Sequence, residues 1–105
     1  MSHGYHIAVY HCHQAVEKML KAVLNEHEKD IPKIHHLVRL LGLTGLEAPP
    51  TIAQAIADLN PHYAPIRYPD LGFRPNFIYT YTRKNTEEII GSAKQIIIWL
   101  KTQIQ

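Results

Sequence analysis

The chain has 105 residues, of which 46% are hydrophobic and 19% charged, a balance typical of one globular domain spanning residues 1–105. Its formal net charge of +2 is too small for the basic surface that duplex nucleic acid requires. The single cysteine, Cys12, excludes an intrachain disulfide and favours a cytoplasmic location. The longest apolar run, residues 96–100, is much shorter than the ~20 residues of a membrane span, so no membrane association is expected.

The first half of the chain predicts one long and one short helix. Over residues 5–27, apolar side chains recur at the three- and four-residue steps of one helical face. They include Ala8, Cys12, Ala15, Met19 and Val23. The polar residues 28–33 end this helix. A short helix is expected over residues 35–41, with Gly42 and Gly45 as stop signals.

The second half predicts another short helix and another long one. The short helix starts with Thr51 as its expected N-cap and ends before Asn60-Pro61, because proline disfavours helical geometry in the preceding residue. Residues 61–75 contain four prolines and are expected to form an irregular loop rich in aromatic side chains. The last long helix is expected to begin near Thr82. The predicted fold is therefore all-α, an antiparallel up-and-down bundle of two long and two short helices.

Three sequence segments stand out when they are taken together in chain order. They are HCHQAVEKMLKAVL at 11–24, KIHHLVRLL at 33–41 and LNPHYAPIRYPD at 59–70, followed by the last long helix. Together they resemble the HEPN family of small prokaryotic helical-bundle proteins. That family normally has another helix before the first string, whereas only residues 1–10 precede it here, so the resemblance implies a shortened N-terminus. An apolar groove left uncovered in this way would favour self-association, and we expect a homodimer.

The resemblance also bears on activity. Many HEPN proteins are ribonucleases with an Arg-x4-6-His motif, in which the imidazole moves a proton and the arginine steadies the phosphate. Here the last histidine is His62 and only the distant Arg39 precedes it among the arginines, so this motif is absent. The resemblance therefore implies a non-catalytic protein that binds a nucleotide, a phosphate group or a partner. It further implies pairing with a small nucleotidyltransferase in a toxin–antitoxin-like module, with no cofactor.

The candidate ligand-binding residues come from the same three strings. Arg67 can hold a phosphate through two hydrogen bonds, and Tyr68 can stack on a base. The candidate set is Gln14, Glu17, Lys18, Lys21, His35, His36, Tyr63, Arg67, Tyr68 and Asp70. Each also has a structural interpretation. Asp70 could pair with Arg67, the tyrosines could fill a groove between helices, and the two histidines could cap the short helix.

Two other functions stay open at the level of the sequence. The first is a metal-independent ribonuclease, in which Arg67 and either His35 or His36 converge in space without the family motif and act on RNA. The second is a protein-interaction module whose cleft binds no ligand. The eight histidines also raise the question of a metal. We expect no metal site, because the histidines near the start of the chain lack an evident third protein ligand at helical spacing.

Overall fold

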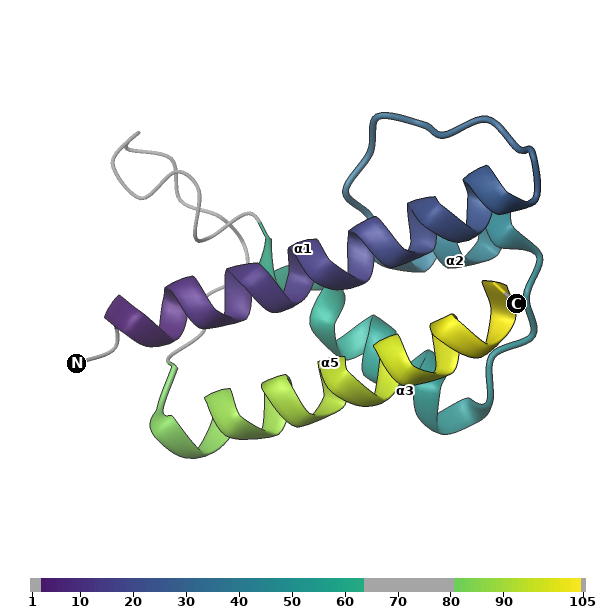
Figure 1. The fold of residues 1–105 in the computed structure, drawn as a ribbon. Coiled ribbons are helices and arrows are strands. Elements are labelled where there is room, and N and C mark those ends of the chain that lie inside the picture. The colour runs from purple at the N-terminus through teal and green to yellow at the C-terminus, as the bar shows by residue number, and fades with distance from the viewer. Residues whose placement is uncertain (1–2, 64–80, 105) are drawn as a thin grey trace.

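The computed structural model describes residues 3–63 and 81–104, and these form helices without any strand (Figure 1). The elements are α1 (His3–Glu26), α2 (Leu37–Thr44), α3 (Pro50–Leu59), the 3-10 helix η1 (Asn60–His62) and α5 (Arg83–Ile104). Over these ranges the predicted all-α bundle of two long and two short helices is confirmed. The expected antiparallel, up-and-down course is wrong for the two long helices, which run in parallel. Within the described ranges, no helix has both the length and the apolar character needed to cross a membrane.

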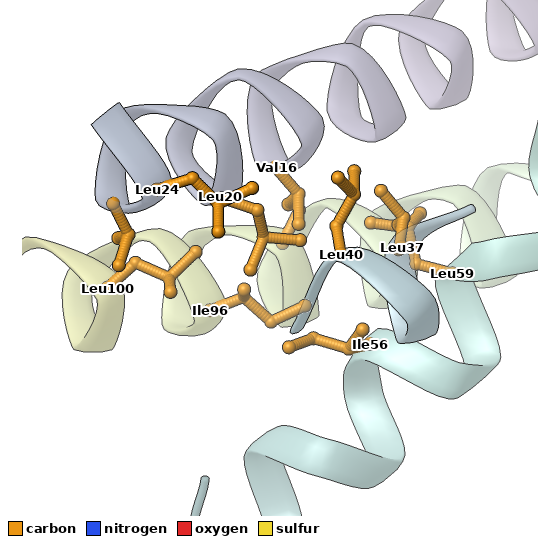
Figure 2. Close-up of a cluster of buried hydrophobic side chains, with 11 residues drawn as sticks. Val16, Leu20, Leu24, Leu37, Leu40, Ile56, Leu59, Ile96 and Leu100 are labelled. Carbon is orange, nitrogen blue, oxygen red and sulfur yellow. The ribbon is translucent and has the colours of Figure 1, made fainter. Parts of the chain in front are cut away.

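The two long helices, α1 and α5, lie side by side and run in the same direction (Figure 1). At their beginnings, the ring of Tyr81 meets that of His6 with centroids 4.6 Å apart. At their ends, Leu24 and Leu100 lie at the same end of the core (Figure 2). The parallel arrangement arises because α3 and η1 bring the chain back toward the start of α1. There, His62 of η1 shares a hydrogen bond with Tyr81, which comes just before α5.

The core is built from the apolar faces of α1, α2, α3 and α5 (Figure 2). Burying one such leucine or isoleucine contributes about 1.5–3 kcal/mol, so the coincidence of the four faces is the main stabilising feature of the bundle. The labelled core residues are Val16, Leu20 and Leu24 of α1, Leu37 and Leu40 of α2, Ile56 and Leu59 of α3, and Ile96 and Leu100 of α5.

The connection between α1 and α2 is fixed at both ends. At the end of α1, Glu28 takes a left-handed conformation with φ of 58°. The backbone N–H of Lys29 then donates to the carbonyl of Leu24 at 2.8 Å, as in a Schellman cap. The ammonium of Lys29 also donates to the carbonyls of Leu43 and Thr44, at 3.2 and 3.1 Å, which end α2. These contacts hold the loop that carries His35 and His36.

The start of α2 is capped by His36, whose Nδ1 accepts the backbone N–H of Arg39 at 3.1 Å. Asn60 supports the same turn, because its Oδ1 accepts the N–H of Leu37 at 2.7 Å. Gly45, with φ of 75°, ends α2, so the glycine stop signal at this position is confirmed, whereas the one expected at Gly42 is wrong because Gly42 lies inside the helix.

The starts of the other two helices differ in how well the sequence predicted them. Thr51 was the expected cap of α3, and that prediction is wrong. Pro50 occupies the first turn, where its missing N–H costs nothing, and Thr51 lies inside the helix. The start of α5 is confirmed. Thr82 and Asn85 exchange side chain–backbone hydrogen bonds of 2.8 and 3.1 Å across its first turn.

Candidate functional site

Glu17 lies at the centre of a polar cluster on α1. Its carboxylate, whose side chain is 12% exposed, accepts a hydrogen bond of 3.0 Å from the ammonium of Lys21 one turn later. It also accepts from Nδ1 of His35, with distances of 2.9 Å to Oε2 and 3.0 Å to Oε1. His35 comes from the loop before α2, so this carboxylate joins two parts of the chain that are 18 residues apart.

Aromatic rings extend the cluster toward η1. The ring of His35 stacks on that of Tyr63, with centroids 4.5 Å apart and planes inclined by 20°. Tyr63 also lies 5.4 Å from the ring of His13 and 6.5 Å from that of Tyr10, measured between centroids. The hydroxyl of Tyr10 accepts a 2.9 Å hydrogen bond from Gln14. We call Glu17, Lys21, His35 and Tyr63 the Glu17 cluster.

The structure thus brings some of the predicted ligand-binding residues together and places others away from the Glu17 cluster. Gln14, Glu17, Lys21, His35 and Tyr63 meet on one side of α1. Lys18 is exposed on α1, and no hydrogen bond or ion pair joins it to the cluster within the described ranges. Nδ1 of His36 caps α2, and its Nε2 lies 3.5 Å from the amide nitrogen of Asn60. Arg67, Tyr68 and Asp70 lie outside the described residues, so their part in the site stays a prediction.

His13 belongs to this site and was missed as such by the sequence analysis. Its side chain is fully buried, and neither ring nitrogen has a hydrogen-bond partner among the residues described. Nδ1 lies 3.8 Å from Oε1 of Glu17, too far for a hydrogen bond. Leaving a buried polar group without a partner costs about 1–3 kcal/mol. The four-residue step from His13 to Glu17 was the available signal, because it places both on one helical face.

The pKa of His13 reflects this environment. Burial lowers it from 6.5 to about 4, since the charged imidazolium would lose its hydration. The Glu17 carboxylate and the backbone of Asn60 oppose this effect, whereas His35 and His62 add to it. His13 is therefore neutral at pH 7, although a carboxylate lies next to it.

A second histidine is also buried, between η1 and the start of α5. His62 is 4% exposed and shares a hydrogen bond with the hydroxyl of Tyr81. Burial lowers the pKa of His62, and Asp58 partly opposes that effect. In the parts of the chain that the structure covers, no group of three potential ligands is arranged to hold a metal ion.

A separate hollow of about 420 Å³ lies between α3, η1 and α5. Its described lining includes the carboxylates of Asp58 and Glu88, and no lysine or arginine. Such a lining repels anions. Of the two places, the Glu17 cluster therefore suits an anionic ligand better.

The Glu17 cluster has three chemical capabilities. The Nδ1–H of His35 is held by a carboxylate, which leaves Nε2 as the nitrogen available at the surface, and the side chain is 46% exposed. Lys21 contributes an ammonium group that is partly exposed. Tyr63 offers a flat ring. Together these groups can bind an anion, accept or donate a proton, and stack on a planar ring.

Comparison with known proteins identifies the family of this chain. The description "HEPN domain" belongs to the family whose model matches residues 2–103, nearly the whole chain. Searches of curated proteins and of solved structures gave no match. The chain belongs to the HEPN domain family.

Proposed function

We propose that this protein binds a nucleotide or another phosphate-bearing ligand at the Glu17 cluster, without catalysis of its own. The observation that carries the proposal is the shared carboxylate of Glu17. It holds the ammonium of Lys21 and the imidazole of His35 next to each other, and His35 in turn stacks on Tyr63. A cation, an imidazole and an aromatic ring at one place suit a phosphate joined to a planar base.

Chain connectivity supports a contribution from the predicted arginine. Arg67 follows Tyr63 by four residues, and four residues of extended chain span at most about 14 Å. The guanidinium can therefore reach a phosphate held at the Glu17 cluster. Tyr68 and Asp70, the other predicted residues of this segment, follow immediately.

Calorimetric titration of the chain with inorganic phosphate, AMP, ATP, GTP and short RNA tests the proposal. We expect saturable binding of at least one of them. Lys21→Ala, His35→Ala and Arg67→Ala should each weaken it by about tenfold or more, because each removes a charge-assisted or polar contact. Lys101→Ala is the matched control. It removes an equal charge from an exposed residue in the last turn of α5. Silence with all five ligands would contradict the proposal and favour a protein-interaction module.

We also propose that the protein acts as a homodimer and pairs with a small nucleotidyltransferase in a toxin–antitoxin-like module. Membership of the HEPN domain family supports this pairing at the family level. Light scattering at high micromolar concentration tests the dimer, and a stable monomer would contradict it. Co-purification with a nucleotidyltransferase encoded beside this chain tests the pairing. Separate elution of the two proteins at micromolar concentrations would contradict it.

One observation favours a second function, a metal-independent ribonuclease. A carboxylate that holds Nδ1–H of an imidazole fixes the tautomer whose Nε2 can accept a proton, as general-base catalysis requires. This geometry selects His35 rather than His36, whose Nδ1 caps α2. RNA cleavage that His35→Asn and Arg67→Ala abolish, but His36→Asn preserves, would establish the enzyme. Asparagine keeps the cap in the His36 variant.

A further inference from the structure

Glu17 lies between two imidazoles, one at the surface and one in the interior. The outer ring, His35, is hydrogen-bonded to both carboxylate oxygens, whereas the inner ring, His13, approaches only Oε1 and stops at 3.8 Å. Lys21 bonds the other oxygen, Oε2, at 3.0 Å. Oε1 is therefore the oxygen that can turn from His35 to His13 while Lys21 keeps its contact.

We propose that His13, Glu17 and His35 form a proton-coupled switch beneath the candidate site. When His13 is protonated, it draws Oε1 of Glu17 inward. His35, with the Tyr63 ring stacked on it, then loses its 3.0 Å bond to Oε1 and keeps only the 2.9 Å bond to Oε2, which it shares with Lys21. Only the binding of a ligand next to His35 rests on the function proposed above. The exchange of partners itself needs no ligand.

The surroundings of His13 make Glu17 the partner that an imidazolium would take. Among the described residues, the titratable groups that face it are Glu17 from α1, His35 from the loop before α2, and His62 and Tyr63 from η1 and its end. Within the described ranges, no charged side chain of α2, α3 or α5 contributes to the shift in the pKa of His13. Only Glu17 in this group carries a negative charge at neutral pH. Within the described ranges no side chain is hydrogen-bonded to either nitrogen of the neutral ring, and the backbone of Asn60 is the other group that favours its charged form.

The consequence for the site follows from competition for one carboxylate. While both oxygens of Glu17 are bonded to Nδ1 of His35, the carboxylate lies directly against the imidazole that would meet an anion. Protonation of His13 draws one of these oxygens inward and adds a positive charge beneath the site. By linkage, an anion that binds more tightly when His13 is protonated must also promote proton uptake at His13.

Nuclear magnetic resonance of the full chain tests the exchange without a ligand. Histidine and tyrosine side chains are labelled, and the pH is lowered from 7.5 while the amide spectrum reports that the chain is folded. We expect the ring signals of His35 and Tyr63 to shift together with the protonation of His13, and this component to vanish in His13→Gln. Signals of His35 and Tyr63 that are unmoved as His13 titrates, or that move identically in His13→Gln, would overturn the switch.

Calorimetric binding of sulfate at pH 7.5 and 5.5 tests the coupling. Sulfate is the probe because it does not titrate in this range. An opposite charge can raise the pKa of a histidine by about two pH units. If the pKa of His13 rises by that amount from about 4 when sulfate binds, linkage tightens sulfate binding at pH 5.5 by about fourfold. We therefore expect the gain in affinity on going from pH 7.5 to 5.5 to be about fourfold larger in the wild type than in His13→Gln.

His27→Gln is the matched control for this experiment, because His27 is an exposed histidine beyond the end of α1. It should keep the wild-type gain in affinity. An equal gain in the wild type and in His13→Gln would overturn the coupling. If sulfate binds at neither pH, the proposed anion site fails, and the resonance experiment alone decides whether the switch exists.

Discussion

His13 and His62 are both neutral in the folded protein at pH 7, because burial lowers the pKa of each ring. The two rings differ in their partners. His62 shares a hydrogen bond with Tyr81, whereas His13 has no hydrogen bond within the described ranges and depends on Glu17 at 3.8 Å. A neutral buried base makes the stability of a protein sensitive to acid, and the sign of the effect follows from linkage.

The free energy of unfolding should fall as the pH is lowered through the range from 6.5 to 4. In that range unfolded His13, with its ordinary pKa of 6.5, binds a proton that folded His13, with a pKa of about 4, does not bind. We expect a loss of about 2 kcal/mol between pH 7.5 and pH 5 from this residue. Urea denaturation at the two pH values measures it. In His13→Leu the free energy of unfolding should depend less steeply on pH. An equally steep dependence would contradict the assignment of this loss of stability to His13.

The cap formed by His36 should contribute to stability independently of any ligand. Its Nδ1 satisfies the backbone N–H of Arg39 in the first turn of α2. Loss of an N-cap costs about 0.5–2 kcal/mol, so His36→Ala should lower the melting temperature by several degrees. His36→Asn keeps an acceptor at the same position and should melt near the wild type. Equal melting temperatures for the wild type and His36→Ala would show that the cap contributes nothing.

At the scale of the elements, the ends of the helices decide where the site residues lie. The left-handed residue Glu28 turns the chain at the end of α1, and Lys29 then ties the loop to the end of α2. The same loop returns to the middle of α1, where His35 meets Glu17. A strained turn therefore positions His35 of the Glu17 cluster.

Replacing Glu28 with glycine should stabilise the protein. An L-residue in the left-handed region is strained by roughly 1–2 kcal/mol, and glycine avoids this strain while losing some chain entropy on folding. We expect a net gain of about 0.5–1 kcal/mol in the free energy of unfolding by urea. Glu26→Gly, the same substitution at the last residue of α1, is the control and should destabilise. A loss of stability in Glu28→Gly would contradict this account of the turn.

At the scale of the whole molecule, one core joins α1, α2, α3 and α5, and the two long helices pack along each other in parallel. The cluster and the core share α1, because Glu17 lies between the buried residues Val16 and Leu20. The position of Glu17 beside His35 and His13 therefore depends on how the bundle packs. Changes in the core should reach the site through α1.

Ile96→Ala should lower the free energy of unfolding by about 2–5 kcal/mol, because Ile96 is fully buried among the core residues of α1 and α5. Ile98→Ala, two residues away on the same helix, should change it by less than about 0.5 kcal/mol, since Ile98 is 58% exposed. Urea denaturation of both variants measures the difference. Similar losses in the two would contradict the placement of the core face of α5.

The sequence by itself determined the helices and the family. Apolar spacing marks one face of each helix, Gly45 and Asn60-Pro61 mark ends, and Thr82 marks a start, since these are local effects of neighbouring residues. The resemblance also indicated that Glu17, Lys21, His35 and Tyr63 belong together.

Only the tertiary structure decided that α1 and α5 run in the same direction and that His13 is fully buried. It also decided that Glu17 accepts hydrogen bonds from both Lys21 and His35, with His13 next to it. The physical reason is that spacing along a helix fixes which side chains share a face. What covers that face depends on how distant segments pack, and the burial that lowers the pKa of His13 exists only once they have packed.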